Sequence, residues 1–433
     1  MAQLSDDCFD PGTALLSLDQ ALTILHQRLK PVVPDEPCAL SRAAGRILAN
    51  DVMATRSVPP TDNSAVDGYA VRHADLRTDT ASTLTVVGRA TAGHPWPGHL
   101  QAGQAVRIFT GAVMPAGADT ILMQEDCVQT NDTVTVSPGI RVGANRRQAG
   151  EDVMAGQVLI TAGRRLRPAD IGLLAAQGLA EVAVRRRLRV AVLSTGDEVH
   201  EPGAVAPHDA IYDANRYMLV ALLDGLAMDT LDLGILPDTT AAISEALARA
   251  AHGPDAADVV ITSGGMSVGE EDHMRAAVAA VGRLDFWRLA IKPGRPVAMG
   301  AVDRHKANPA AAAGGEPLVF IGLPGNPVAV GVTFMRLARP ALLRLAGATD
   351  TIPNPQGVSA GFAMAKKAGR REWVRVRLVK GPGDQMAAER FASDGAGILS
   401  SLAAADGLVE LPEDTTQVTP GDLVTFYSYG ELT

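Results

Sequence analysis

Cysteine is scarce in this sequence of 433 residues. The chain contains only Cys8, Cys38 and Cys127, which form no CxxC pair and have no histidine nearby at metal-ligand spacing. A small, odd number of scattered cysteines argues against a disulfide framework and against a cysteine-based zinc site. Such cysteines are typical of reduced thiols in the cytoplasm.

Long apolar runs and an excess of positive charge are also missing. No apolar run reaches the roughly 18 residues of a membrane helix. The first residues lack the basic region and apolar core of a signal peptide. The net charge of −9 argues against general nucleic-acid binding. We therefore expect a cytoplasmic enzyme with neither nucleic acid nor a membrane as partner.

The first part of the chain alternates between helical and β patterns. Apolar spacing predicts a helix over Ser17–Leu29, which begins with a capping box, and a second short helix over Ser41–Leu48. Short alternating runs between Gly, Pro and Asp turns predict a small β domain at 52–150. Because this unit interrupts two mixed segments, we expect 13–51 and 151–187 to form one discontinuous mixed α/β domain.

The second part of the chain has a more regular pattern. Strands and helices alternate through 188–348, which predicts a parallel sheet with helices on both faces, a doubly wound α/β domain. A linker with two prolines follows, and short strands and turns at 357–433 predict a C-terminal β domain. The expected fold class is thus a multidomain α/β plus β protein.

The stretch from Val259 to Met274 joins a buried strand to a helix through a loop of small residues. Such a loop presents free backbone N–H groups, which favour an anion. Carboxylates follow it, and carboxylates beside an anion site make sense where Mg²⁺ bridges the two. The stretch therefore predicts a phosphorylated ligand held with Mg²⁺ at the carboxyl edge of the sheet. The loop residues concerned are Ser263, Gly264, Gly265 and Ser267.

Three acidic residues follow strands of this domain: Glu198, Asp238 and Asp272. An acid in a turn or at a helix start is structural more often than functional, so each alone is weak evidence. Ligands of doubly wound sheets sit outside the carboxyl ends of the strands, and three acids at that edge strengthen the functional interpretation. Because Mg²⁺ takes only one or two carboxylates, not all three need be ligands.

Two further loops have the composition of an anion site. Lys292 and Arg295 flank Pro293 and Gly294, and this pair of cations suits a tetrahedral oxyanion, although a solvated basic turn has about even odds. The turn GLPGNP leaves a strand and enters a helix, which would let the backbone approach a ligand closely. The residues of this turn that we expect at the ligand are Pro324, Gly325 and Asn326.

The loop at 62–70, which enters the small β domain, is dense in polar side chains. A simple turn would need only Asp67 and Gly68, so the two acids, the amide and the hydroxyl in this loop suggest a further role. Thr110, in FTGA, and Asp152, in RRQAGED, are weaker candidates of the same kind.

Eight motifs together resemble one known family. In chain order they are DNSAVDGYA, RIFTGAVMP, RRQAGED, STGDE, IYDANR, TSGGMSVGEED, LAIKPGRP and GLPGNP. This order is similar to that of the molybdopterin molybdenumtransferases, the MoeA-type proteins, whose eukaryotic relatives are the E domains of gephyrin-like proteins. The resemblance covers nearly the whole chain, including a C-terminal GRREWVR that resembles the family's GRxEFxR.

The resemblance implies a reaction. Family members use Mg²⁺ to cleave the phosphoanhydride of adenylylated molybdopterin, insert molybdate at the dithiolene and release AMP and molybdenum cofactor. They are elongated homodimers whose active site is completed by the β domain of the other subunit. No adenylylating domain is fused to this chain, so a separate adenylyltransferase would supply the substrate.

The resemblance also implies roles for individual residues. Asp67, Thr110, Glu198 and Asp238 would be catalytic, and Glu198, Asp238 and Asp272 would surround the Mg²⁺. Lys292 and Arg295 would face molybdate. The other expected substrate contacts are Asp152, Ser263, Gly264, Gly265, Ser267, Pro324, Gly325, Asn326, Arg375 and Ser400.

The chain departs from the family at two motif positions. Thr61 stands where the family often has Phe, and Arg295 where it often has Lys. Arginine keeps the charge but presents a planar fork, so the geometry of the oxyanion is open, as is the choice of molybdate or tungstate. The alternatives are adenylyl transfer to molybdopterin, which leaves the first 185 or so residues unexplained, and a non-catalytic molybdopterin-binding scaffold.

Overall fold

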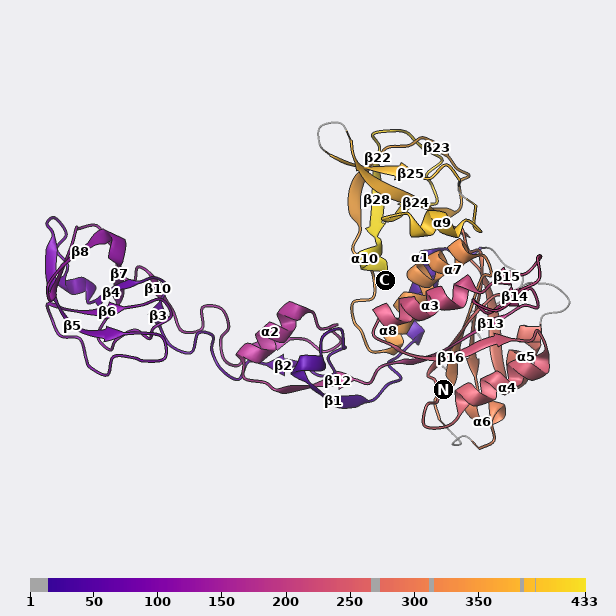
Figure 1. The fold of residues 1–433 in the computed structure, drawn as a ribbon, viewed down its shortest axis with the longest axis horizontal. Coiled ribbons are helices and arrows are strands. Elements are labelled where there is room, and N and C mark those ends of the chain that lie inside the picture. Colours follow the sequence, from indigo (N-terminus) through magenta and orange to yellow (C-terminus); the bar gives the residue numbers. More distant parts are fainter. Residues whose placement is uncertain (1–14, 266–272, 311–314, 382–384, 394) are drawn as a thin grey trace.

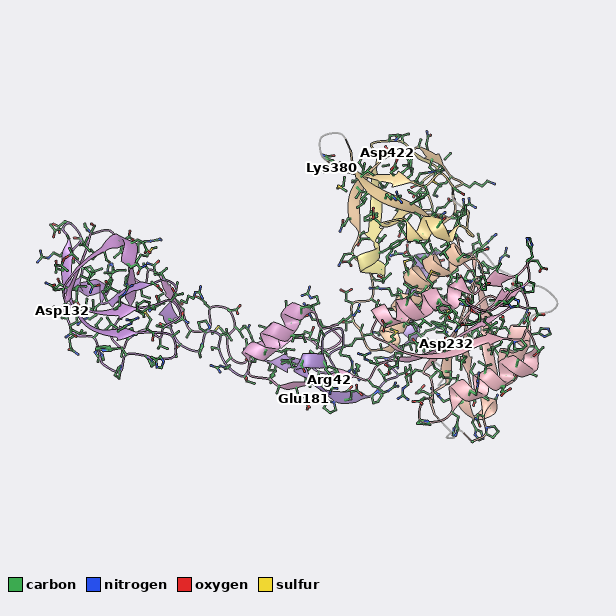
Figure 2. All side chains as sticks on the ribbon, viewed as in Figure 1. Arg42, Asp132, Glu181, Asp232, Lys380 and Asp422 are labelled. Carbon is green, nitrogen blue, oxygen red and sulfur yellow. The ribbon has the colours of Figure 1, made fainter. Side chains whose placement is uncertain are left out.

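The computed structural model describes residues 15–265, 273–310, 315–381, 385–393 and 395–433. The molecule is elongated, with a small β lobe at one end joined by a narrow arm to a larger body (Figure 1). Asp132 lies in the β lobe at the left end of the view, and Asp422 lies at the top of the body (Figure 2). Among the described residues, no helix combines the length and the apolar character needed to cross a membrane.

A six-stranded sheet forms the centre of the body. The first four strands in its spatial order are parallel; the fifth, β20, runs antiparallel to them, and the edge strand β18 is antiparallel to β20. In spatial order the strands are β16 (Asp229–Leu236), β13 (Arg189–Thr195), β17 (Val259–Ser263), β21 (Leu318–Leu323), β20 (Pro296–Val302) and β18 (Gly282–Arg288). The doubly wound prediction is confirmed for the parallel part. The β20–β21 connection carries only a four-residue helix among its described residues, and antiparallel neighbours need no long crossover.

Helices cover both faces of this sheet (Figure 1). They are α1 (Leu18–Arg28), α3 (Ala214–Gly225), α4 (Thr240–Ala251), α5 (His273–Val281), α6 (Arg304–Ala307), α7 (Pro327–Thr333) and α8 (Arg339–Leu345), with a π-helical turn between α7 and α8. Alternate residues of β13 face opposite ways: Val190 and Val192 join the core under α1, α3, α7 and α8, while Ala191 and Leu193 join the core under α4 and α5. The predicted capping box of α1 is present, with Ser17 and Gln20 bonding to each other's backbone N–H.

The arm is built from two chain segments that are distant in sequence. Its elements are β1 (Asp35–Ala39), β12 (Glu181–Arg185), β2 (Val52–Met53), β11 (Val158–Ile160) and α2 (Pro168–Ala176), with β1 paired to β12 and β2 to β11. The predicted helix over Ser41–Leu48 is wrong. Only a 3₁₀ turn forms at Leu40–Arg42, because Gly45 adopts φ +78° and Leu48 bridges to Val184.

The β lobe contains one six-stranded sheet with a small core on each side. In spatial order its strands are β7 (Thr120–Met123), β4 (Gly68–Val71), β6 (Gln104–Ile108), β5 (Ser82–Ala90), β9 (Thr133–Val136) and β8 (Cys127–Thr130). A two-stranded ribbon of β3 (Asn63–Ser64) and β10 (Arg146–Arg147) lies where the lobe meets the arm (Figure 1).

The C-terminal domain is a β-barrel, which confirms the predicted β character. Its strands are β24 (Arg371–Lys380), β25 (Met386–Arg390), β22 (Gln356–Ala360), β28 (Leu423–Ser428) and β26 (Gly407–Leu411), and β26 returns to pair with β24. The short elements are β23 (Met364–Ala365), β27 (Gln417–Val418), α9 (Leu399–Ala403) and α10 (Tyr429–Leu432). The barrel is connected to the central domain through β19 (Ile291–Lys292), which pairs with β24.

Candidate functional site

The carboxyl ends of the four parallel strands meet at one edge of the central sheet. The register aligns Ser263 at the end of β17 with Ser194 on β13 and with Leu323 on β21, and Thr195 with Leu236 at the end of β16. The loops that follow these strands are therefore neighbours. The predicted site residues in these loops are Glu198, Asp238, Ser263, Gly264, Gly265, Pro324, Gly325 and Asn326.

Glycine is required where these loops come together. Gly264 and Gly265 have φ of +87° and +65°, which other residues rarely adopt. A Cβ on Gly265 would lie only 2.9 Å from the hydroxyl of Thr195. The Gly264 N–H donates to the Leu323 carbonyl at 3.2 Å, which ties this loop to the turn containing Gly325. The turns thus form a close-packed cradle of backbone at the sheet edge.

Asn215 is a residue of this edge that sequence reasoning missed. Its side-chain amide donates to the Gly325 carbonyl at 2.7 Å, while its Oδ1 is buried without a hydrogen-bond partner among the described residues. Asp213 caps α3 and pairs with the guanidinium of Arg216 at 3.1 Å, which anchors the helix that carries Asn215. The motif IYDANR contained the signal, since it places Asp213, Asn215 and Arg216 at a helix start.

Asp238 has no structural partner that would explain it. It lies directly after β16, yet Thr239 provides the cap of α4, with its hydroxyl accepting from the Ala242 N–H at 3.3 Å. Among the described residues, the carboxylate of Asp238 has neither a hydrogen-bond nor an ion-pair partner, although the residue is half-buried. The simple N-cap interpretation therefore fails for Asp238.

Glu198 lies on the neighbouring loop after β13 and is exposed. Its carboxylate turns back over Gly196, where an added Cβ would meet the two oxygens at 2.8 and 3.0 Å. The described residues hold no group of three or more His, Cys, Asp or Glu side chains placed to bind a metal. Ser267 and Asp272, which the sequence also places in this site, lie outside the described residues.

The loop that contains Lys292 and Arg295 lies at the same edge of the sheet, where it leads into the antiparallel strand β20. Since β20 runs antiparallel to β21, with Ala298 opposite Gly322, the start of β20 lies beside the end of β21. Gly294 packs so tightly on α7 that a Cβ there would lie 2.3 Å from Thr333 Cγ2. Arg295 is exposed and has no ion-pair partner within the described part of the chain.

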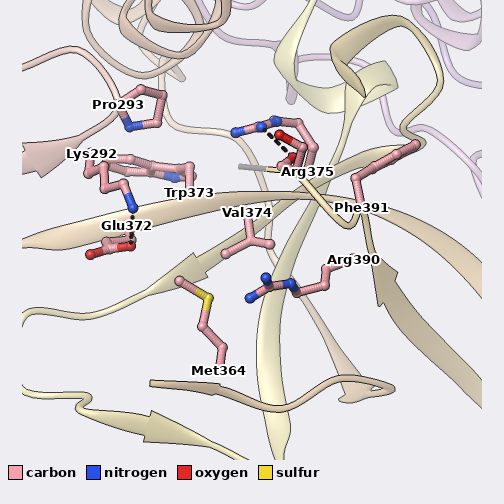
Figure 3. Close-up of a pocket in the computed structure, with 10 residues that line it drawn as sticks. Lys292, Pro293, Met364, Glu372, Trp373, Val374, Arg375, Arg390 and Phe391 are labelled. Carbon is pink, nitrogen blue, oxygen red and sulfur yellow. Dashed lines mark hydrogen bonds and ion pairs between the residues drawn. The ribbon is translucent and has the colours of Figure 1, made fainter. Parts of the chain in front are cut away.

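A pocket lies beside this loop, where the central domain meets the barrel (Figure 3). We call it the inner pocket, defined by Lys292, Pro293, Glu372, Arg375 and Arg390. The Lys292 ammonium lies 3.6 Å from Glu372 Oε2, on the opposite side of the pocket from Arg375 (Figure 3).

Arg375 is held rigidly in the wall of the inner pocket. It is 3% exposed, and its Nε donates to the hydroxyl of Ser401 at 3.0 Å. A second nitrogen donates to the Ser393 carbonyl at 3.2 Å. The arginine contact thus falls on Ser401, whereas the predicted Ser400 is exposed at the start of α9. Sequence reasoning also missed Glu372, although it lies within GRREWVR.

The other predicted residues lie in the β lobe and the arm. Asp67 Oδ1 accepts from the Thr110 N–H at 2.8 Å and from its hydroxyl at 2.7 Å. The hydrogen bond from the Thr110 N–H has the largest effect on the pKa of Asp67. Together with the hydroxyl bond and the nearby Arg107 guanidinium, it holds that pKa below its ordinary value. Asp152 is exposed, with its N–H bonded to the Val58 carbonyl at 3.1 Å. Within one chain these three residues lie far from the sheet edge (Figure 1).

Family models match most of the chain. Residues 16–178 match the MoeA N-terminal region (domain I and II), and residues 191–344 match a probable molybdopterin-binding domain. Residues 358–429 match the MoeA C-terminal region (domain IV). In chain order, the three matches correspond to the arm with the β lobe, to the central domain and to the barrel.

Whole-chain comparisons agree with these matches. A molybdopterin molybdenumtransferase of Haemophilus influenzae is 37% identical over 96% of this chain and all of its own length, and one of Nostoc sp. is 36% identical over 88% and 85%. The crystal structure of a molybdopterin biosynthesis MoeA protein from Pyrococcus horikoshii OT3 superposes with a TM-score of 0.78 at 28% identity, over 96% of this chain and 100% of that one. The chain is therefore an enzyme of the molybdopterin molybdenumtransferase family.

Proposed function

We propose that this enzyme inserts molybdate into adenylylated molybdopterin, in a Mg²⁺-dependent reaction that releases AMP and molybdenum cofactor. The observation that carries the proposal is the meeting of three kinds of group at one sheet edge. A glycine cradle, carboxylates that have no partner among the described residues, and a pair of cations lie on adjoining loops. These groups suit a phosphoanhydride, a divalent ion and a tetrahedral oxyanion respectively.

The cradle would hold the phosphate of the pterin. Gly264 and Gly265 allow the backbone of this loop to approach a ligand without interference from side chains, and Asn215 fixes the opposing turn through the Gly325 carbonyl. The buried Oδ1 of Asn215, which lacks a partner within the described part of the chain, suits an N–H or O–H donor of the ligand.

Glu198 and Asp238 fit a divalent cation. Both carboxylates lie at this edge, neither has a cation or a hydrogen-bond donor bound to it within the described part of the chain, and two carboxylates with phosphate and water are a usual Mg²⁺ set. When bound, the ion would neutralise charge that develops as the phosphoanhydride breaks. Asp272 is the third acid proposed for this set and lies outside the described residues.

The cations would face the molybdate. Lys292 is oriented by the buried carboxylate of Glu372, and Arg295 lies on the same loop. Each charge-assisted hydrogen bond to the oxyanion is worth on the order of 1.5–3 kcal/mol. Arg375, whose Nε donates to Ser401, lines the inner pocket together with Lys292. Ser400, which precedes Ser401 in the sequence, is proposed as a weaker candidate.

Asp67 and Thr110 would act from a second subunit. The β lobe stands far from the sheet edge of its own chain (Figure 1), so a homodimer in which each β lobe meets the partner's edge would bring the two sets together. A carboxylate whose pKa is lowered stays ionised at neutral pH, so Asp67 would accept a hydrogen bond from the reacting groups. Asp152 is proposed as a further contact from the arm.

A direct assay separates this function from its alternatives. The purified enzyme is incubated with adenylylated molybdopterin, Mg²⁺ and molybdate, and AMP is measured. AMP release that requires molybdate supports insertion, whereas consumption of ATP with unmodified molybdopterin would indicate adenylyl transfer. Binding of the pterin without either reaction would indicate a scaffold. We also propose that the enzyme works in the cytoplasm and receives its substrate from a separate adenylyltransferase.

A further inference from the structure

A second cavity opens on the barrel side of the inner pocket. We call it the outer cleft, defined by Lys366, Lys367 and Arg370, with Lys292, Glu372 and Arg390 on the wall that it shares with the inner pocket. Its volume is about 590 Å³. Five of the residues that line it are cationic and one is acidic, in a chain whose net charge is −9. The cleft is therefore a local positive region on a protein that otherwise repels anions.

Glu372 connects the two cavities. The residue is 2% exposed, and its Oε1 accepts from Arg370 Nε at 2.7 Å while its Oε2 lies 3.6 Å from Lys292 Nζ. One carboxylate thus orients a cation of the outer cleft and a cation of the inner pocket. The two cavities therefore share one carboxylate in the wall between them.

The remaining cations of the cleft are not neutralised by partners. The Lys366 ammonium donates to the carbonyls of Arg370 at 2.9 Å and Lys367 at 3.4 Å, which carry no net charge. Burial lowers the pKa of Lys366. Arg390 is half-buried, and among the described residues its guanidinium has no ion-pair partner. In Figure 3 it lies between Val374 and Met364.

Acidic groups near the cleft do not cancel this charge. The carboxylates of Glu413 and Asp414 act on Lys366 from a distance, but Glu413 is paired with Arg371 at 3.1 Å. A solvated basic surface would explain exposed lysines such as Lys367. It does not explain a half-buried arginine without a partner at the wall of a second cationic pocket, where desolvation strengthens attraction for an anion.

We propose that the outer cleft is a separate binding site for a free tetrahedral oxyanion, which it collects from solution and delivers past Glu372 to Lys292 and Arg375. Arg390 and Lys366 are its principal contacts. The identity of the oxyanion as molybdate rests on the proposed function, whereas the existence of the site does not. The enzyme gains a raised local concentration of a dilute dianion beside the site that consumes it.

Binding is tested on the full-length protein without turnover. Equilibrium dialysis with molybdate, and separately with AMP as a phosphate monoester, is compared for the parent, Arg390→Gln and Lys366→Gln. The matched control is Lys380→Gln, because Lys380 lies at the opposite end of β24 from Glu372 and is labelled at the outer part of the barrel (Figure 2). We expect each cleft variant to weaken molybdate binding about 5-fold, the loss for about 1 kcal/mol per charge contact, while AMP binding and the control are unchanged.

In the insertion assay, the cleft variants distinguish the binding of molybdate in the cleft from the insertion step itself. Lys366→Gln, which changes a residue of the outer cleft alone, should raise the KM for molybdate about 5-fold, leave kcat at saturating molybdate unchanged, and flatten the fall of kcat/KM with ionic strength. Thermal unfolding checks that each variant is folded. Molybdate binding within twofold of the parent in both variants would overturn the proposal, and a loss confined to AMP would assign the cleft to a substrate phosphate instead. If the parent binds molybdate in the cleft but inserts none, only the proposed function fails.

Discussion

The carboxylates of the β lobe and those of the central sheet edge differ in how they are held. Asp67 receives two hydrogen bonds from Thr110 inside its own lobe, so its position and its ionised state are set before any ligand arrives. Asp238 is half-buried at the sheet edge and has no partner among the described residues. Asp67 is thus preorganised, whereas Asp238 is left available for a ligand.

This difference suggests a division of labour between the two regions. The sheet edge gathers loops from four parallel strands, and its acids and glycines suit a ligand that supplies its own charge and metal. The β lobe presents the Asp67 carboxylate, fixed by Thr110, beside the start of β4, which suits a group that must meet a reacting atom in one geometry. The arm between them keeps the two sets apart within one chain (Figure 1).

The largest effect is expected from Asp67→Asn. An amide keeps the shape and one acceptor for the Thr110 donors but loses the charge, so folding should persist while AMP release falls by at least about 100-fold. Thermal unfolding and the insertion assay measure the two effects. Asp132→Asn, the same change on an exposed turn at the end of the lobe (Figure 2), is the control. A normal rate in Asp67→Asn would remove this residue from the catalytic set.

Mixing two inactive chains tests whether the regions meet across subunits. One chain carries Asp67→Asn, and the other carries both Glu198→Ala and Asp238→Ala. If each site combines the β lobe of one subunit with the sheet edge of its partner, random co-assembly restores about a quarter of the active sites. Activity of the co-expressed mixture is compared with each chain alone. No recovery from a dimeric mixture would contradict the two-subunit site.

Asp238→Ala alone should have a smaller effect that depends on Mg²⁺. Losing one of two carboxylates should raise the Mg²⁺ concentration needed for half-maximal activity by about tenfold, and excess Mg²⁺ should restore much of the rate. The measurement is a Mg²⁺ titration of AMP release. Asp255→Ala, at an exposed turn of the same domain, serves as the control. An unchanged titration curve would take Asp238 off the list of metal ligands.

The smallest effect is expected from a pH profile. Because the pKa of Asp67 is lowered, activity that needs its ionised form persists as pH falls and is lost only below that lowered pKa. Thr110→Val removes the hydroxyl donor and leaves the backbone donor, so the pKa of Asp67 rises and the acidic limb moves to higher pH. A limb that stays in place would mean that another group controls it.

Sequence reasoning succeeded where local chemistry decides the structure. The capping box at Ser17 starts α1, and the alternation of strands and helices predicted for 188–348 forms the parallel part of the central sheet with its helices. It failed over Ser41–Leu48, where helical spacing was real but Gly45 and the pairing of Leu48 with Val184 required an extended chain. A contact with a residue so distant in sequence does not change the apolar spacing within the segment, from which the helix was predicted.

The predicted site residues show the same limit. Glycines and acids that follow strands were identified because each sits at a recognisable strand end, and they remain predictions for function. Arg390 carried no such signal, since it lies on a short barrel strand and reaches the cleft only because β25 pairs with β24. The choice of Ser401 over Ser400 as the partner of Arg375 depends on the rotation of a single helical turn.

The sequence by itself determined the family, the α/β and β character of the parts, and the residue types available for anion and metal chemistry, because motif order and strand-end composition are local properties. Only the tertiary structure decided that Asp67 and Thr110 stand far from Glu198 and Asp238, since the arm is made from segments more than a hundred residues apart. Packing of the barrel against the central domain likewise created the inner pocket and the outer cleft, which no single segment contains.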